Sequence, residues 1–166
     1  MRPNFKNIDI KNAGFAATNA AEWAKANPEK AAKLEMFFSG KAPEVNWAAI
    51  EQKAGVATRA ASATVLSALA TQVENMIVAS ADLSNSDKTD GFLKKTHAFK
   101  KGDFSGAFFQ AGVAELTMAC CCIGMALHGG VIPACGTFFV FSDYMKPAVR
   151  MAALMEVPVK FIWTHD

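Results

Sequence analysis

Charge of either sign is scarce in this sequence. Its 166 residues include 17 Lys and Arg and 15 Asp and Glu, so the formal net charge is +2 and charged residues make up only 19% of the chain. The basic residues are scattered, and their doublets, Lys94-Lys95 and Lys100-Lys101, fall in a polar stretch. The sequence therefore has no electrostatic footprint for nucleic acid.

Cysteines are few, and none is spaced as a C-x-x-C pair. The four are Cys120, Cys121, Cys122 and Cys135. Consecutive helical positions point about 100° apart, so three adjacent thiols cannot converge on one ion. We assign no metal ligand and interpret the cysteines as small buried hydrophobes. Free thiols without a secretory signal lead us to expect a reducing cytoplasm.

Apolar residues make up 52% of the chain, but no run of them is long enough to span a bilayer. The longest apolar helical segment is Leu116 to Leu127. A chain of this size and composition can bury the core of one domain and carry a helical appendage.

Strand-like and helix-like segments alternate along most of the chain. This alternation, with apolar strands, predicts an α/β fold with an open, mostly parallel sheet and helices on both faces. Residues 84–106 are polar and predict a long surface loop. Strands are expected near 76–81, 107–111, 136–141 and 157–164, and helices near 28–39, 47–52, 58–73, 115–128 and 142–155.

Glu115 is the one residue with a formal charge between Asp103 and Asp143. An isolated carboxylate loses its hydration on folding, at a cost of several kcal/mol if it stays ionised and unpaired. The predicted strand, the turn at Gly112 and the predicted helix place Glu115 at the carboxyl end of a strand, where ligand sites gather in open α/β sheets. Two interpretations stay open: a helix-terminal glutamate stabilised by backbone N–H groups, or a functional acid.

Several motifs, taken in order, resemble the pyrimidine-binding domain of transketolase. They are Ala57-Thr-Arg59, Ser80-Ala-Asp-Leu83, Gly112-Val-Ala-Glu115, Gly124-Met-Ala-Leu-His-Gly-Gly130, Gly136-Thr-Phe-Phe-Val-Phe-Ser-Asp-Tyr144 and Thr164-His-Asp166. Ordered motifs are far more specific than any one alone. The resemblance implies a thiamine diphosphate-binding fold of the pyrimidine-domain type over residues 45–166, incomplete at its C-terminal end, after an N-terminal helical linker over residues 1–44.

The resemblance also implies how the chain contacts thiamine diphosphate. Glu115 is the catalytic residue, which holds a proton at the far nitrogen of the aminopyrimidine ring. A carboxyl group in apolar surroundings suits this task, because desolvation favours its protonated form. Without the resemblance, the aromatic residues read as core and Asp82 as a helix cap. The implied cofactor-binding residues are Asp82, Leu83, Glu115, Phe138, Phe141 and Tyr144.

Arg59, Ser86 and His165 match the positions that bind the phosphate of the sugar substrate in the resembled family. A guanidinium suits phosphate because its planar fork makes paired, charged hydrogen bonds, and Ser and His add directional donors. Taken singly, each residue reads as ordinary: a surface Arg, a loop Ser and a strand-end His. Their joint agreement favours the phosphate role.

The implied whole enzyme is a transketolase of the pentose phosphate pathway, a transferase that moves a two-carbon ketol unit between sugar phosphates. Magnesium is expected on a separate diphosphate-binding domain, of the same enzyme or another chain, because Gly-Asp-Gly followed by Asn is absent here. We expect a homodimer and an inactive isolated chain. The alternatives are an inactive binding or assembly module, or a subunit of a related enzyme such as deoxyxylulose-phosphate synthase. Ala114 and Leu116 depart from the common Arg and His.

Overall fold

The computed structural model describes residues 17–165 and divides into two compact units, Met1–Ser39 and Gly40–Asp166. In the first unit, residues 17–26 are helical and helix α2 (Pro28–Phe38) follows, with its proline in the first turn. None of the side chains of α2 is buried. The first 16 residues of the predicted linker, and Asp166 of the last motif, lie outside the described residues.

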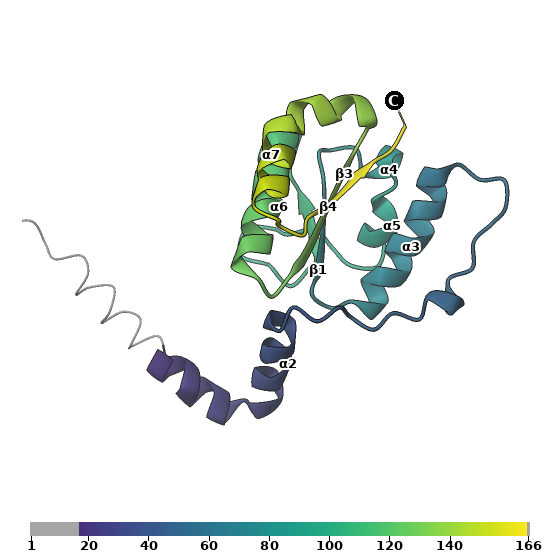
Figure 1. The fold of residues 1–166 in the computed structure, drawn as a ribbon. Coiled ribbons are helices and arrows are strands. Elements are labelled where there is room, and N and C mark those ends of the chain that lie inside the picture. The colour runs from purple at the N-terminus through teal and green to yellow at the C-terminus, as the bar shows by residue number, and fades with distance from the viewer. Residues whose placement is uncertain (1–16, 166) are drawn as a thin grey trace, which may run out of the picture. The chain divides into compact units, whose positions relative to one another are not determined.

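The second unit alternates strands and helices as the sequence predicts (Figure 1). The predicted helices at 58–73 and 115–128 match the observed ones to within a residue. Within the described part of the chain, no helix is long and apolar enough to cross a bilayer. In chain order the elements are η1 (Trp47–Ala49), α3 (Thr58–Gln72), β1 (Met76–Ser80), α4 (Ser84–Asp87), α5 (Asp90–Leu93), β2 (Phe108–Gln110), α6 (Glu115–His128), β3 (Ile132–Thr137), η2 (Phe139–Phe141), α7 (Ser142–Leu154) and β4 (Lys160–Trp163).

The four strands form one sheet in the order β2-β1-β3-β4, and every pair is parallel. Ser80, the last residue of β1, lies opposite Gln110 of β2 and Gly136 of β3. Thr137 of β3 lies opposite Trp163 of β4. The carboxyl ends of all four strands therefore meet at the same edge, and the predicted parallel α/β fold is confirmed.

Successive strand residues point to opposite sides of the sheet, and helices bury both of these faces. Val78 and Ala134 pack in one core cluster with side chains of α3 and α5. Their neighbours Ala79 and Cys135 pack in a second cluster with side chains of α6 and α7. Figure 1 shows the same arrangement, with α6 and α7 on one side of the sheet and α3, α4 and α5 on the other.

Two segments differ from their predictions. The third strand is β3, at Ile132–Thr137, instead of 136–141, because the strand pairs with β1 from Ile132 onward and the chain leaves the sheet after Thr137. The aromatic run that suggested a strand is the 3-10 turn η2. Residues 84–106 are no simple surface loop, since they contain α4, α5 and the fully buried Phe92.

The prediction of buried cysteines is correct for two of the four. Cys122 and Cys135 lie in the core between α6 and β3, where their mutual hydrogen bond, together with burial, raises the pKa of the Cys135 thiol. Cys120 and Cys121 are exposed because they lie on the outer side of α6. Within the described residues, no group of three or more His, Cys, Asp and Glu could hold a metal ion.

A glycine is required where α5 crosses α3. A Cβ atom on Gly91 would collide with the carbonyl oxygen of Ala63 and lie 2.9 Å from its carbonyl carbon. We expect Gly91→Ala to lower the free energy of unfolding by about 1–3 kcal/mol, because neither backbone can yield without moving its helix. Urea unfolding of the variant measures this change.

Gly124 is the matched control. It lies in the exposed part of α6, and a Cβ atom there meets nothing within 4 Å. Gly124→Ala should be neutral or raise the free energy of unfolding by up to about 1 kcal/mol, through helix propensity alone. Equal effects of the two substitutions would contradict the close approach.

Candidate functional site

The loops that follow the four strands all leave the same edge of the sheet. Asp82 and Leu83 follow β1, Glu115 follows β2, Phe138 follows β3 and His165 follows β4. From β1 the chain proceeds to β2 on one side, and from β3 it proceeds to β4 on the other. The carboxyl edge between β1 and β3 is therefore a topological switch point, which is where open α/β sheets bind ligands.

Arg59, Ser86 and His165 lie in direct contact at this edge. The Nη1 atom of Arg59 donates a hydrogen bond to the Ser86 carbonyl oxygen at 3.2 Å. The same atom lies 2.6 Å from Nε2 and 3.1 Å from Nδ1 of His165. A guanidinium has no acceptor, so the imidazole accepts in this contact.

A pocket of about 290 Å³ opens beside this contact, and its lining includes the Arg59 and His165 side chains. The other lining residues come from the start of α3 and the end of β4: Ala57, Thr58, Trp163 and Thr164. Ser86 belongs to the cluster through its backbone oxygen, while its hydroxyl donates to Asn85 Oδ1 at 3.2 Å. The lining thus combines polar side chains with the Trp163 indole.

Phe138, Phe141 and Tyr144 form a continuous row of rings. Phe138 and Phe141 have centroids 5.7 Å apart and planes inclined by 12°, and Phe141 and Tyr144 have centroids 6.1 Å apart and planes inclined by 22°. At its other end the row reaches His165, whose ring centroid lies 4.4 Å from that of Phe138. Tyr144 is 62% exposed, so the row is open to solvent. The aromatic row therefore ends at His165, which also contacts the cationic Arg59 side chain.

Glu115 is the first residue of α6 and is only 8% exposed. It lies in the helix's first turn, where unpaired backbone N–H groups and the helix dipole favour a carboxylate. Among the described residues, no hydrogen bond or ring contact joins Glu115 to the aromatic row or to Arg59. The structure therefore places Glu115 on the same edge of the sheet, outside the contact chain that runs from Tyr144 to Arg59.

Asp82 and Leu83 form the turn between β1 and α4. Asp82 is exposed and has a positive φ of 65°, a conformation that costs a residue other than glycine free energy. The Leu83 backbone N–H donates to Ser80 Oγ at 3.3 Å, and the Leu83 carbonyl oxygen accepts from the N–H groups of Ser86 and Asp87 at 2.8 Å each. The turn is therefore tied to the strand before it and to the helix after it.

Sequence reasoning missed a buried polar network beneath this turn. The Asp87 carboxylate, in a residue only 1% exposed, accepts from Ser80 Oγ at 2.7 Å, from the Thr89 N–H at 2.8 Å and from Thr89 Oγ1 at 2.7 Å. Burial raises the pKa of Asp87, and the hydrogen bonds from Thr89 and Ser80 oppose that rise. The Asp-x-Thr spacing, which is typical of a turn closed by its own side chain, is the signal that could have revealed it.

Thr137 is a second residue that the sequence did not single out. It ends β3, is fully buried, and its Oγ1 is a buried side-chain polar atom without a hydrogen-bond partner among the described residues. Such a group in a native structure calls for an explanation. Thr137 immediately precedes Phe138, the first residue of the aromatic row.

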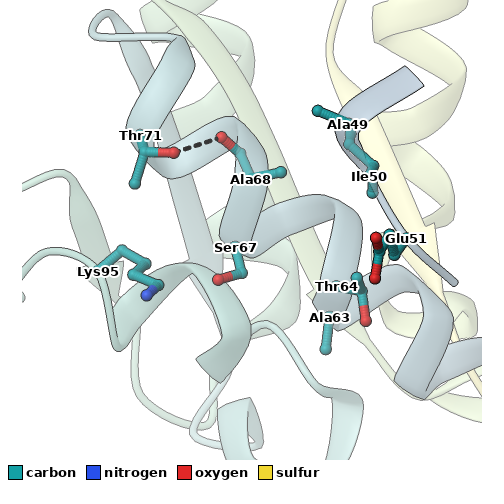
Figure 2. Close-up of a pocket in the computed structure, with 9 residues that line it drawn as sticks. All are labelled: Ala49, Ile50, Glu51, Ala63, Thr64, Ser67, Ala68, Thr71 and Lys95. Atoms are coloured by element: carbon teal, nitrogen blue, oxygen red, sulfur yellow. Dashed lines mark hydrogen bonds between the residues drawn. The ribbon is translucent and has the colours of Figure 1, made fainter. Parts of the chain in front are cut away.

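A second pocket, of about 510 Å³, lies elsewhere (Figure 2). Figure 2 shows small side chains of α3 along one wall, with Glu51 and Lys95 as the charged residues. None of the predicted site residues lines it. The other lining residues are Ala49, Ile50, Ala63, Thr64, Ser67, Ala68 and Thr71. Volume alone therefore does not select the site.

The chain is similar to transketolases in sequence and in structure. The family model "Transketolase, pyrimidine binding domain" matches residues 54–166. Transketolases of Halalkalibacterium halodurans and Bacillus subtilis are 43% and 42% identical over 150 residues, which is 88% of this chain and 22% of each relative. The chain thus spans about a fifth of the length of these curated relatives.

Solved structures of transketolases also resemble this chain. A transketolase of Leishmania mexicana matches with a TM-score of 0.83 and 31% identity, over 96% of this chain and 24% of that chain. A transketolase of Pichia stipitis, in complex with sedoheptulose 7-phosphate, matches with a TM-score of 0.80 and 34% identity, over 97% of this chain and 25% of that chain.

The raised pKa of Asp87 generates a prediction for stability. A carboxyl group that binds its proton more tightly when folded contributes stability below its ordinary value of 3.8, and this contribution is lost as the pH rises through the folded value. We expect the wild-type chain to lose stability relative to Asp87→Asn as the pH rises from 3.8 to neutral. Urea unfolding of both proteins over this range tests it, and parallel stability curves would contradict it.

Proposed function

Since the chain belongs to the transketolase family, through the family's pyrimidine-binding domain, we propose that it supplies the pyrimidine half of a thiamine diphosphate site in a transketolase. The whole enzyme transfers a two-carbon ketol unit between sugar phosphates. The observation that carries the proposal is the unbroken contact chain from Tyr144 through Phe141, Phe138 and His165 to Arg59. It joins a surface for an aromatic ring to one for a phosphate.

The aromatic row fits an aminopyrimidine ring. Phe138 and Phe141 are partly buried and nearly parallel, and such rings favour offset stacking with a flat heterocycle. Asp82 and Leu83 are proposed to contact the cofactor from the neighbouring turn. Bound thiamine diphosphate supplies the nucleophilic carbon that carries the transferred unit, and the protein supplies binding and orientation.

Glu115 is proposed to hold a proton at the far nitrogen of the aminopyrimidine ring. Its near-complete burial supports this role, because a buried carboxyl group makes a stronger hydrogen bond than one exposed to water. Because Glu115 lies in the first turn of α6, the helix fixes the backbone that carries its carboxyl group. Family membership also implies magnesium, whose ligands we assign to the diphosphate-binding domain of the same enzyme or of a separate chain.

Arg59, Ser86 and His165 are proposed to bind the phosphate of the sugar. The Arg59 guanidinium provides the charge and a planar pair of donors. The Ser86 hydroxyl and the His165 ring would add donors on turning toward the phosphate from Asn85 Oδ1 and Arg59, which they contact in this structure. Arg59 and His165, from the start of α3 and the end of β4, line one small pocket, and Ser86 of α4 contacts Arg59 through its carbonyl oxygen; this arrangement supports the proposal. A phosphate in the pocket would sit beside the aromatic row.

The outer side of α6 supports the proposed homodimer. Leu116, Cys120 and Leu127 are exposed along this helix, and Glu115 is its one residue with a formal charge. An exposed, uncharged helix face of this kind favours association with a partner. We propose that this side of α6 meets its copy in a second chain.

Arg59→Ala tests the phosphate role in the assembled enzyme that contains this chain. We expect the KM for a phosphorylated ketose donor to rise by about 10- to 100-fold, because a charged hydrogen bond is worth about 1.5–3 kcal/mol. The KM for an unphosphorylated ketose should stay nearly unchanged. Steady-state kinetics with both donors, at saturating cofactor, measure the difference.

Arg150→Ala is the matched control for Arg59, because Arg150 is an exposed arginine in the middle of α7. It should leave both donors unaffected. An equal rise in KM for the two donors in the Arg59 variant would contradict the phosphate role.

Glu115→Gln tests the acid. Glutamine keeps the size of the side chain but cannot hold the shared proton, so we expect kcat of the assembled enzyme to fall by about 10²–10⁴-fold. Glu35→Gln, on the exposed surface of α2, should have no effect. Near-normal turnover of the Glu115 variant at saturating cofactor would remove Glu115 from the proposed site.

A further inference from the structure

We propose that Asp87 is a positioning residue, which sets the geometry of the phosphate contacts from beneath the site. The inference rests on the proposed function, because it assigns Asp87 a purpose in the site that Arg59 and Ser86 form. Asp87 itself is only 1% exposed and lines neither of the two pockets described above. It acts through the backbone of the residue before it.

The first step is the completeness of the network. Three donors point at one buried carboxylate: Ser80 Oγ on Oδ2, and the Thr89 N–H and hydroxyl on Oδ1. Ser80 and Thr89 are themselves 1% and 0% exposed. Buried polar groups that are fully bonded rigidify their surroundings, because every alternative arrangement leaves one of them unsatisfied.

The second step is the segment that this network closes. Helix α4 has four residues, which is too short to be stable by itself. It is entered through Asp82, with φ 65°, and left through Lys88, with φ 68°. Ser80 also accepts the Leu83 N–H at 3.3 Å, so the network holds the chain before α4 as well as after it.

The third step joins α4 to the site. Ser86 precedes Asp87, and its carbonyl oxygen accepts the Arg59 Nη1 hydrogen bond at 3.2 Å. The direction of that carbonyl group follows from the backbone of α4, which the network holds. The orientation of the Arg59 guanidinium toward the pocket therefore depends on the buried carboxylate of Asp87.

The sheet prevents the network from relaxing. A Cβ atom on Gly136 of β3 would collide with the Thr89 methyl group and lie 3.5 Å from Asp87 Oδ2. The bare backbone of β3 therefore packs directly against the network. Ser80, Asp87, Thr89 and Gly136 act as one packed unit between the sheet and α4.

Two substitutions separate positioning from packing. Asp87→Ala removes the acceptor for all three donors and leaves them buried without a partner. Asp87→Asn keeps an oxygen for the two Thr89 donors, and its amide can donate to Ser80 Oγ. If Asp87 positions Ser86, the Asn variant restores what the Ala variant loses, although both lack the charge.

The experiment uses the assembled enzyme containing this chain, with saturating cofactor and two donors, a phosphorylated and an unphosphorylated ketose. We expect Asp87→Ala to raise the KM for the phosphorylated donor about tenfold, with kcat and the unphosphorylated donor changed less than about twofold. Asp87→Asn should stay within about twofold of the wild type for every constant. Asp103→Ala is the matched control, because Asp103 accepts the corresponding two bonds from Ser105 on an exposed loop. It should change none of these constants.

The outcomes separate this inference from the proposed function. If Arg59→Ala affects the two donors equally, the proposed phosphate site is wrong. If Arg59→Ala is selective but Asp87→Ala is neutral, or raises both KM values equally, the positioning role is overturned. Should Asp87→Ala fail to fold, Thr89→Val replaces it, since valine keeps the methyl group against Gly136 and removes one donor. A selective rise in KM supports the role, and an unchanged KM overturns it.

Discussion

The parallel pairing of β1 with both β2 and β3 is the constraint on which the rest of the structure depends. Ser80 lies opposite Gln110 on one side and Gly136 on the other, so three chain segments leave the sheet at one level. Parallel strands need long crossovers, and these crossovers are the helices that bury the two faces. Residues separated by more than a hundred positions, such as Arg59 and His165, meet at this edge as a consequence.

Much of this arrangement could be predicted where local pattern and tertiary packing agree. Helix α6 begins and ends where the sequence indicates, because an uninterrupted helix-forming run follows the Gly112 turn and stops at Gly129, whose φ is 82°. The order of the motifs predicts the site residues as a set, although no single one is distinctive, and their roles stay a prediction. The sequence did not predict the contact between Arg59, at the start of α3, and His165, after β4.

The remainder could not be predicted because a distant partner decides it. Residues 84–106 are polar enough for a surface loop, yet several of their polar groups bond to one another. Gly91 also lets Phe92 reach the core against α3. The run from Phe138 to Phe141 has strand propensity, but the pairing of β3 with β1 ends at Gly136 and its pairing with β4 ends at Thr137. Cys120 and Cys122 differ in burial although they lie two positions apart in the same helix, because only one side of α6 faces the sheet.

The same topology explains why an arginine suits this site better than a lysine. One nitrogen of Arg59, Nη1, makes the contacts to the Ser86 oxygen and to His165. The guanidinium is planar, so fixing this corner also fixes the direction of Nε and Nη2, which remain as a parallel pair of donors. A lysine ammonium held at one contact would still rotate. For the proposed phosphate role, donors that are already oriented would lose less side-chain entropy on binding.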